Sequence, residues 1–155
     1  MNTKLNTPAA KKNRKRKGRP RLAPGYRPSE DEAFMNPRHL EFFRRALFDW
    51  RGELLKESNL TLQHLQEDSM QSPDMADRAS AETERSVELR TRDRERKLIS
   101  KITEALERIE SGTYGYCMET GVPIGIRRLE ARPIATLSLE AQERHERMEK
   151  IYRDD

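Results

Sequence analysis

The sequence is short of cysteine, with only Cys117 in 155 residues. One thiol excludes an intramolecular disulfide, and it excludes a zinc site built from several cysteines of one chain. No stretch approaches the roughly 20 apolar residues that a membrane-spanning helix needs, and the N-terminus lacks the apolar segment of a secretory signal. We therefore expect a protein of the reducing cytoplasm that has no membrane partner.

Apolar side chains are also scarce. Hydrophobic residues make up 34% of the chain and aromatic residues 6%, whereas 37% of the residues are charged. This ratio is unfavourable for a globular enzyme with a large catalytic cleft, and it is typical of long helices that are exposed to water. The sequence contains no phosphate-binding glycine loop and no nucleophile beside a paired base. We therefore predict that the protein is not an enzyme.

Acidic residues are absent from residues 1–28, which contain ten Lys and Arg. The other 127 residues carry 21 basic and 27 acidic side chains, so the basic pI of about 9.3 comes from the N-terminal arm. Its Pro, Gly, Asn and Lys content predicts disorder over residues 1–33. Two interpretations of this arm stay open, a solvated tail and non-specific contact with nucleic acid or a polymerase surface.

Two long helices are predicted between residues 34 and 112. Asn36 before Pro37 is a helix start signal, and apolar residues then recur at spacings of three and four from Leu40. Ser72 before Pro73 repeats the start signal, and Gly112 ends the second helix after about Glu110. The fold class is therefore mainly α, with an antiparallel coiled-coil hairpin about 50 Å long. Its tip lies near residues 70–79.

Residues 113–155 form the last predicted unit. Gly, Pro, Tyr and β-branched residues over 113–136 indicate a small irregular module with one or two short strands. Ser138 caps a C-terminal helix that runs to about Tyr152. One face of this helix is expected to pack on the module, through Ala141, His145, Met148 and Tyr152. His145 is interpreted as an interface residue rather than a metal ligand.

Three segments resemble the DksA family of bacterial transcription factors, which bind RNA polymerase in its secondary channel. They are YGYCMETGVPIGIRRLEARP at 114–133, ELRTRDRERKLI at 88–99 and DMADRA at 74–79. The resemblance covers roughly residues 34–150. It implies a degenerate zinc-finger-like module at the hairpin base. It also implies direct binding of RNA polymerase and modulation of transcription initiation in the stringent response, without sequence-specific DNA binding.

The tip of the hairpin has an acidic motif. Asp74 and Asp77 are three residues apart, so they share one face of the first helical turn, where the helix dipole favours carboxylates. Spacing alone leaves open that Asp74 only caps the helix and that Asp77 only solvates it. The resemblance implies instead that Asp74, Asp77 and the small Ala79 act together at the polymerase catalytic region.

The resemblance further implies a site, shared with polymerase, for the alarmone guanosine tetraphosphate. Leu98, Lys101 and Arg132 match the family positions that line it, and Arg94 is a candidate polymerase contact. Cationic donors suit a ligand with two diphosphates. Gln142 replaces a lysine that is usual in the family, which removes one positive charge. Without the resemblance, Lys101 and Arg132 would be ordinary solvated charges.

The zinc positions of the family are degenerate here. Where the family has four cysteines, this chain has Cys117, Thr120, Ser138 and Ala141. Since Thr and Ser are poor zinc ligands and Ala is none, we expect neither a structural zinc nor another cofactor. Cys117 is interpreted as an inert, partly buried thiol, with redox sensing as the alternative.

An alternative from another class is a structural coiled-coil protein whose basic arm binds nucleic acid without sequence preference. Such a protein would need an outward apolar seam for dimerisation. The apolar stripes suffice only for one intramolecular pairing, because His64, Asp68 and Arg94 interrupt a longer seam. We therefore predict a monomer.

Overall fold

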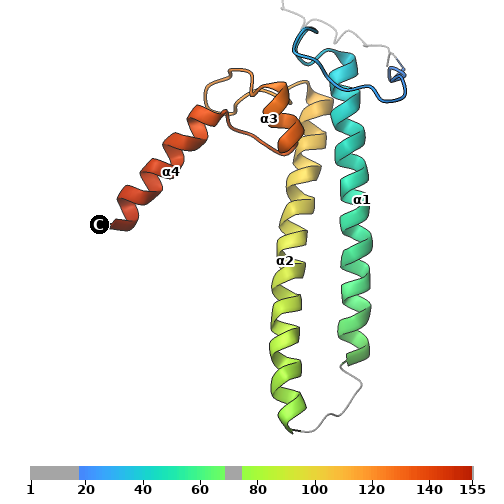
Figure 1. The fold of residues 1–155 in the computed structure, drawn as a ribbon, viewed down its shortest axis with the longest axis vertical. Coiled ribbons are helices and arrows are strands. Elements are labelled where there is room, and N and C mark those ends of the chain that lie inside the picture. The colour runs from blue at the N-terminus through green and yellow to red at the C-terminus, as the bar shows by residue number, and fades with distance from the viewer. Residues whose placement is uncertain (1–17, 69–74, 155) are drawn as a thin grey trace, which may run out of the picture.

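The computed structural model of the chain describes residues 18–68 and 75–154, and Figure 1 shows their arrangement. Four helices follow one another: α1 (Pro37–Asp68), α2 (Met75–Ser111), α3 (Ile126–Ala131) and α4 (Leu139–Asp154). The mainly α prediction is confirmed. The short strands expected in residues 113–136 are reduced, within the described residues, to one antiparallel bridge between Tyr116 and Pro123. Helix α3 occupies part of the same region instead.

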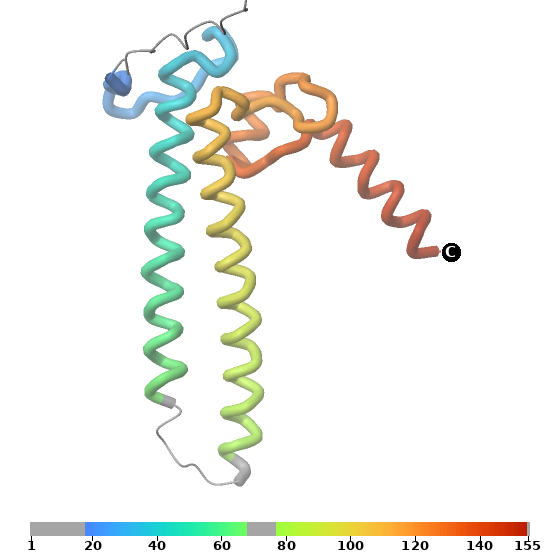
Figure 2. Tube along the Cα trace, turned by 180° about the vertical axis from the view of Figure 1, so that it is seen from behind, coloured from blue at the N-terminus to red at the C-terminus, as the bar shows by residue number. Residues whose placement is uncertain are grey.

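Helices α1 and α2 lie side by side and antiparallel, as both views show (Figures 1 and 2). The predicted start of α1 is confirmed, because Asn36 Oδ1 accepts the free N–H groups of Arg38 and His39 at 2.8 and 3.1 Å. Helix α2 ends at Ser111, directly before Gly112, whose φ of 79° suits glycine. The tip that the sequence predicts near residues 70–79 lies partly in residues 69–74, which are outside the described residues. No helix in the described ranges is long and apolar enough to cross a membrane.

The hydrophobic core is confined to the base of the hairpin. Phe43 and Leu47 of α1 and Ile102 of α2 are fully buried there, against the module that follows α2. Toward the tip, the last buried apolar side chain of α1 is Leu54. The tip half of the hairpin therefore depends on helix propensity and partial side-chain contact more than on burial, as the thin apolar stripe predicts.

The small module, residues 113–138, packs beside the base of α2 (Figures 1 and 2). It is closed by main-chain hydrogen bonds: Cys117 donates its N–H to Val122 O at 2.8 Å, and Gly121 donates to Cys117 O at 2.8 Å. Tyr114 is its anchor, since this fully buried residue donates its hydroxyl to Pro133 O at 2.7 Å. The ring of Tyr114 lies 5.6 Å from that of Phe43, which joins the module to α1.

Residues 18–36 form a strap across the base of α1. Within the strap, the carboxylate of Glu32 accepts the Tyr26 hydroxyl at 2.6 Å and the Asn36 amide at 3.2 Å. The Nε2 atom of the buried His39 lies 2.9 Å from the same carboxylate. These hydrogen bonds, that from Tyr26 above all, lower the pKa of Glu32. One carboxylate therefore fastens the strap to the first turn of α1.

The strap also reaches the module. Phe34 packs edge-on against Tyr116, and two ion pairs join the strap to α3, Arg27 with Glu130 at 2.9 Å and Arg127 with Glu30 at 3.4 Å. The sequence predicts disorder over residues 1–33, so this is a correction for residues 18–33. They are ordered because their rings and charges have partners far along the chain. Residues 1–17 lie outside the described residues.

Helix α4 leaves the module and diverges from the hairpin (Figure 1). Its first turn is attached as expected, because Ser138 Oγ accepts the Ala141 N–H at 3.3 Å and Ala141 is fully buried. His145 contacts Glu119 of the module, in agreement with its interpretation as an interface residue. The expectation fails for the second half of the helix, since Met148 and Tyr152 are exposed there.

The contact between Met35 and Gly115 generates a prediction. Gly115 has a φ of 92°, and a Cβ atom built on it would lie 2.8 Å from the side chain of Met35. We expect Gly115→Ala to lower the free energy of unfolding by about 2 kcal/mol, through backbone strain and displacement of the strap. Chemical denaturation of the two proteins measures the difference.

Gly52→Ala is the matched control. Gly52 lies inside α1, and a Cβ atom there would meet nothing within 4 Å. This substitution should stabilise the protein by about 0.5–1 kcal/mol. Equal effects of the two substitutions would contradict a special role for the strap contact at Gly115.

Candidate functional site

The described part of the acidic tip lies on α2. Asp77 is in the first turn of the helix, and both Asp77 and Ala79 are exposed. Glu82 and Glu84 are also exposed, so the start of the helix presents several carboxylates to solvent. The positive, N-terminal end of the helix dipole stabilises the carboxylate of Asp77. Asp74 lies outside the described residues, so its alignment with Asp77 stays a prediction.

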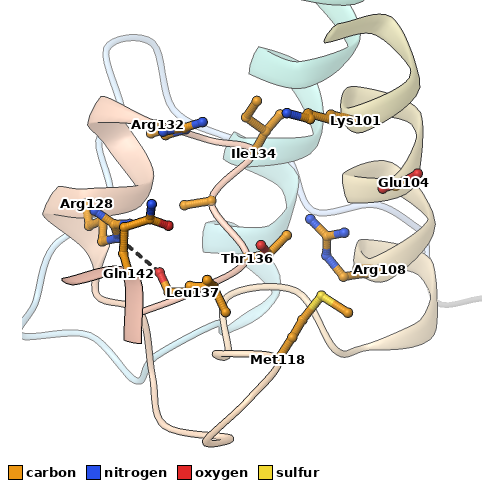
Figure 3. Close-up of a pocket in the computed structure, with 11 residues that line it drawn as sticks. Lys101, Glu104, Arg108, Met118, Arg128, Arg132, Ile134, Thr136, Leu137 and Gln142 are labelled. Atoms are coloured by element: carbon orange, nitrogen blue, oxygen red, sulfur yellow. Dashed lines mark hydrogen bonds between the residues drawn. The ribbon is translucent and has the colours of Figure 1, made fainter. Parts of the chain in front are cut away.

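A cavity of about 310 Å³ lies between α2 and the module (Figure 3). Helix α2 contributes Lys101, Glu104 and Arg108 to its lining. The module and the first turn of α4 contribute the remaining polar side chains, of Arg128, Arg132, Thr136 and Gln142. Four cationic side chains thus surround one cavity whose lining includes a single carboxylate.

The helical repeat brings these cations together. Lys101 and Arg108 are seven residues apart on α2, which places them on one face, two turns from each other. Arg128 is in the last turn of α3, and its Nε donates to Leu137 O at 3.1 Å, which holds the guanidinium at the cavity. Arg132 is the C-terminal cap residue of α3, directly after Ala131. Two short segments of sequence therefore supply all four cations.

Several residues predicted from the sequence do meet here. Lys101, Arg132 and Gln142 line the same cavity, although 31 residues or more separate Lys101 from the other two along the chain. Leu98 does not line it, and packs partly buried against the core. Arg94 is exposed on α2, one turn nearer the tip than Leu98. The structure therefore brings Lys101, Arg132 and Gln142 to one cavity, and Leu98 lies outside its lining.

Sequence reasoning missed Arg108 and Arg128. Both are surrounded by charged residues in the sequence, and a cation in such a run usually indicates a solvated helix face. The spacing of seven from Lys101 to Arg108 and of four from Arg128 to Arg132 is a signal that both pairs share a face. That signal becomes informative only when the two faces are known to meet.

The four degenerate zinc positions do not form a metal site. Cys117 is buried, Thr120 is exposed, Ser138 uses its hydroxyl to cap α4, and Ala141 has no donor atom. One thiol and two hydroxyls do not suit zinc, which takes thiolate, imidazole or carboxylate ligands. The described residues contain no group of three His, Cys, Asp or Glu side chains that could hold a metal ion. The module is held by packing and main-chain hydrogen bonds.

Cys117 nevertheless lies in an environment that favours a thiolate. A hydrogen bond from Thr120 and bonds from the main-chain N–H groups of Ser138, Thr120 and Glu119 lower the pKa of the Cys117 thiol to about 6, against an opposing effect of desolvation. The cysteine is only 2% exposed. Burial restricts attack by oxidants, in agreement with the interpretation of a buried thiol, while its redox role stays untested.

The structural class of this protein is a hairpin of two long helices. The hairpin has an exposed acidic tip, and the small module packs at its base. Two family models match nearly all of that unit. The model for the DnaK suppressor protein DksA, N-terminal domain, matches residues 39–109, and the model for the prokaryotic dksA/traR C4-type zinc finger matches residues 112–147. The chain belongs to the DksA family.

Relatives and a solved structure support the same assignment. The chain is 64% identical over 130 residues to the RNA polymerase-binding transcription factor DksA of Caulobacter vibrioides, covering 84% of this chain and 92% of that protein. It is 48% identical over 117 residues to the protein of the same name in Escherichia coli, covering 76% and 78%. The structure of transcription factor DksA2 from Pseudomonas aeruginosa matches with a TM-score of 0.72 and 45% identity, covering 76% of this chain and 91% of the other.

The thiol environment generates a pH prediction. Because the pKa of Cys117 is lowered from 9.0 to about 6 in the folded protein, its thiolate stabilises the fold fully above about pH 9. That contribution is lost as the pH falls toward 6. We expect the difference in melting temperature between the natural protein and Cys117→Ala to increase steadily from pH 6 to pH 9.

Each variant is compared with the natural protein at the same pH, because the effects of all other titrating groups on the melting temperature then cancel in the difference. Cys117→Ser keeps a small polar side chain that does not titrate, and its deficit should follow the same pH curve. A difference that is constant across pH 6–9 would show that the cysteine is a thiol in the folded protein throughout.

Proposed function

We propose that the protein binds bacterial RNA polymerase directly, inserts its hairpin through the secondary channel and modulates transcription initiation. The observation that carries the proposal is the hairpin itself. Helix α2 has 37 residues, about 55 Å, and its tip half is not covered by any other described element (Figures 1 and 2). A narrow rod of this length reaches a site deep inside a channel while the module stays outside. Relatives at 64% and 48% identity are named RNA polymerase-binding transcription factors.

The acidic tip is the acting part in this proposal. Asp77 is exposed in the first turn of α2, where a carboxylate can approach a cationic or metal-rich surface. Ala79, two residues later, is small enough to let the helix approach such a surface closely. Together with Asp74, these residues destabilise short-lived promoter complexes from inside the enzyme. No sequence-specific contact with DNA is needed for this action.

The cavity beside α2 is the proposed site for guanosine tetraphosphate, at a surface shared with polymerase. Lys101 and Arg132 line it from two elements and offer charge-assisted hydrogen bonds to a diphosphate. Leu98, which is half-buried next to this region of α2, offers apolar surface rather than a cavity wall. Arg94 lies nearer the tip on α2 and is the proposed contact with the outer part of the channel.

A monomer is the proposed acting state. The buried apolar side chains of α1 and α2 belong to one core cluster that they share with the module. A hairpin that pairs its own two stripes has no buried seam left for a second copy. A single rod also fits a channel that a four-helix dimer would fill.

Competition for the secondary channel tests the proposal directly. The purified protein should bind RNA polymerase core enzyme, and a second protein that occupies the secondary channel should displace it. Binding that this competitor leaves unchanged would place the protein elsewhere on polymerase. Absence of binding would remove the proposal, and the basic arm with nucleic acid would be the alternative to examine.

Asp77→Asn separates binding from action. Because an exposed charge contributes at most about 1 kcal/mol, the affinity for core enzyme should change by less than about fivefold. The effect on transcription from a sensitive promoter in a purified system should be lost. The control is Asp93→Asn, at an exposed carboxylate 16 residues further along α2 that pairs with Lys97. Unchanged regulation by Asp77→Asn would exclude Asp77 from the mechanism.

Position 142 tests the alarmone part. Gln142 lines the cavity, and its amide hydrogen-bonds to Glu146 at 3.1 Å. Gln142→Lys adds a cation at the cavity, so guanosine tetraphosphate should act on the complex at about tenfold lower concentration. The measurement is an alarmone titration of promoter output with the purified complex. Adding Lys150→Gln, on an exposed part of α4 away from the cavity, restores the original net charge, so the double variant controls for net charge.

A further inference from the structure

Arg108 has a feature that its place in α2 does not explain. Its Nη2 atom is buried and has no hydrogen-bond acceptor among the described residues. The described residues also contain no carboxylate within ion-pair distance of its guanidinium. A buried guanidinium donor without an acceptor is costly, because desolvation is not repaid by a hydrogen bond. An ordered water or a ligand in the cavity can supply the acceptor for such a group.

The side chain of Arg108 is not needed to end its own helix. The main-chain carbonyl of Arg108 does that work, by accepting the N–H groups of Thr113 and Tyr114 at 2.9 and 3.2 Å. The guanidinium instead points into the cavity between α2 and the module, toward Thr136 (Figure 3). The role of the backbone and the role of the side chain are therefore separable.

The surroundings of this guanidinium select an anion. Lys101 lies two turns away on the same face of α2, and Arg128 and Arg132 approach the cavity from the module, as Figure 3 shows. The single carboxylate in the lining, Glu104, is exposed and forms no ion pair with a described residue. With four cations and one carboxylate, the lining carries an excess of three positive charges. A cavity of about 310 Å³ has room for a multivalent anion.

We infer that Arg108 is a further binding residue of this cavity and that its guanidinium receives one diphosphate group of the ligand. The inference rests on the proposed alarmone site and adds to it a cation on the wall opposite Arg128 and Arg132. A planar guanidinium with a free donor suits two oxygens of a phosphate. Binding of the anion would give Nη2 the acceptor that the described residues do not supply.

Nuclear magnetic resonance of the full chain without polymerase tests the inference. The probe is inorganic pyrophosphate, added to 15N-labelled protein while the arginine Nε–H signals are followed. The signal of Arg108 should shift with saturation, and Arg108→Gln should weaken pyrophosphate binding by about tenfold, the loss expected for one charge-assisted hydrogen bond. In the absence of the anion, Arg108→Gln should melt at the same temperature as the natural protein or higher, because it removes an unpaired buried donor.

The matched control is Arg127→Gln. Arg127 adjoins Arg128 in α3, but its side chain is 89% exposed, pairs with Glu30 and does not line the cavity. This variant should bind pyrophosphate as the natural protein does. The inference is overturned by natural protein that binds no pyrophosphate, by Arg108→Gln that binds it equally well, or by an equal loss in Arg127→Gln.

Two further measurements complete the test. One identifies the molecule that carries the diphosphate, and the other separates failure of this inference from failure of the proposed function. Tighter binding of guanosine tetraphosphate than of pyrophosphate, lost in Arg108→Gln, supports a nucleotide as the ligand, and equal binding of the two supports recognition of the diphosphate alone. Binding to RNA polymerase is measured separately. If polymerase binding fails while Arg108-dependent pyrophosphate binding is observed, the proposed function falls and the anion site stands.

Discussion

Burial of Tyr114 is the contact on which the arrangement of this protein depends. Among the described residues it is the largest fully buried side chain, its ring meets Phe43 of α1, and its hydroxyl donates to the carbonyl of Pro133 on the far side of the module. One side chain thus links the end of α2, the start of α1 and the segment before α4. Burial also raises the pKa of its phenol, so the donor stays protonated. The cavity beside α2 exists because this link holds the module against the hairpin.

Aromatic packing holds the module to the rest of the protein. Rings form a continuous path from the strap to the module, from Tyr26 through Phe42 and Phe43 to Tyr114, with successive centroids 5.3–6.3 Å apart. Each such pair contributes about 0.5–1.5 kcal/mol beyond its burial. A strap that covers both α1 and the module extends the core of a unit too small to bury much surface alone. The surviving cysteine adds hydrogen bonds, and its thiol is buried among main-chain donors.

The sequence predicts those features that are encoded locally. Asn36 with Pro37 predicts the start of α1 to the residue, and Ser138 and Gly112 predict two further helix ends, because caps act within one turn. The strap was not predicted, since Arg27 and Glu130 are 103 residues apart and nothing in either segment indicates the other. Lys101 and Arg132 were found through the family resemblance. The sequence does not single out Arg108, because the burial of its guanidinium depends on how the module packs beside α2.

The confinement of the core to one end of the hairpin makes the molecule a lever. The fulcrum is the packed base, where α1, α2 and the module share buried side chains, and the long arm extends from Leu54 to the tip. Residues 54–68 of α1 span about 22 Å, so each degree of rotation at the base displaces the end of the arm by about 0.4 Å. The cavity and its cations lie at the fulcrum. An anion that draws α2 and the module together there would turn the acidic tip, and the displacement of the tip would grow with the length of the arm.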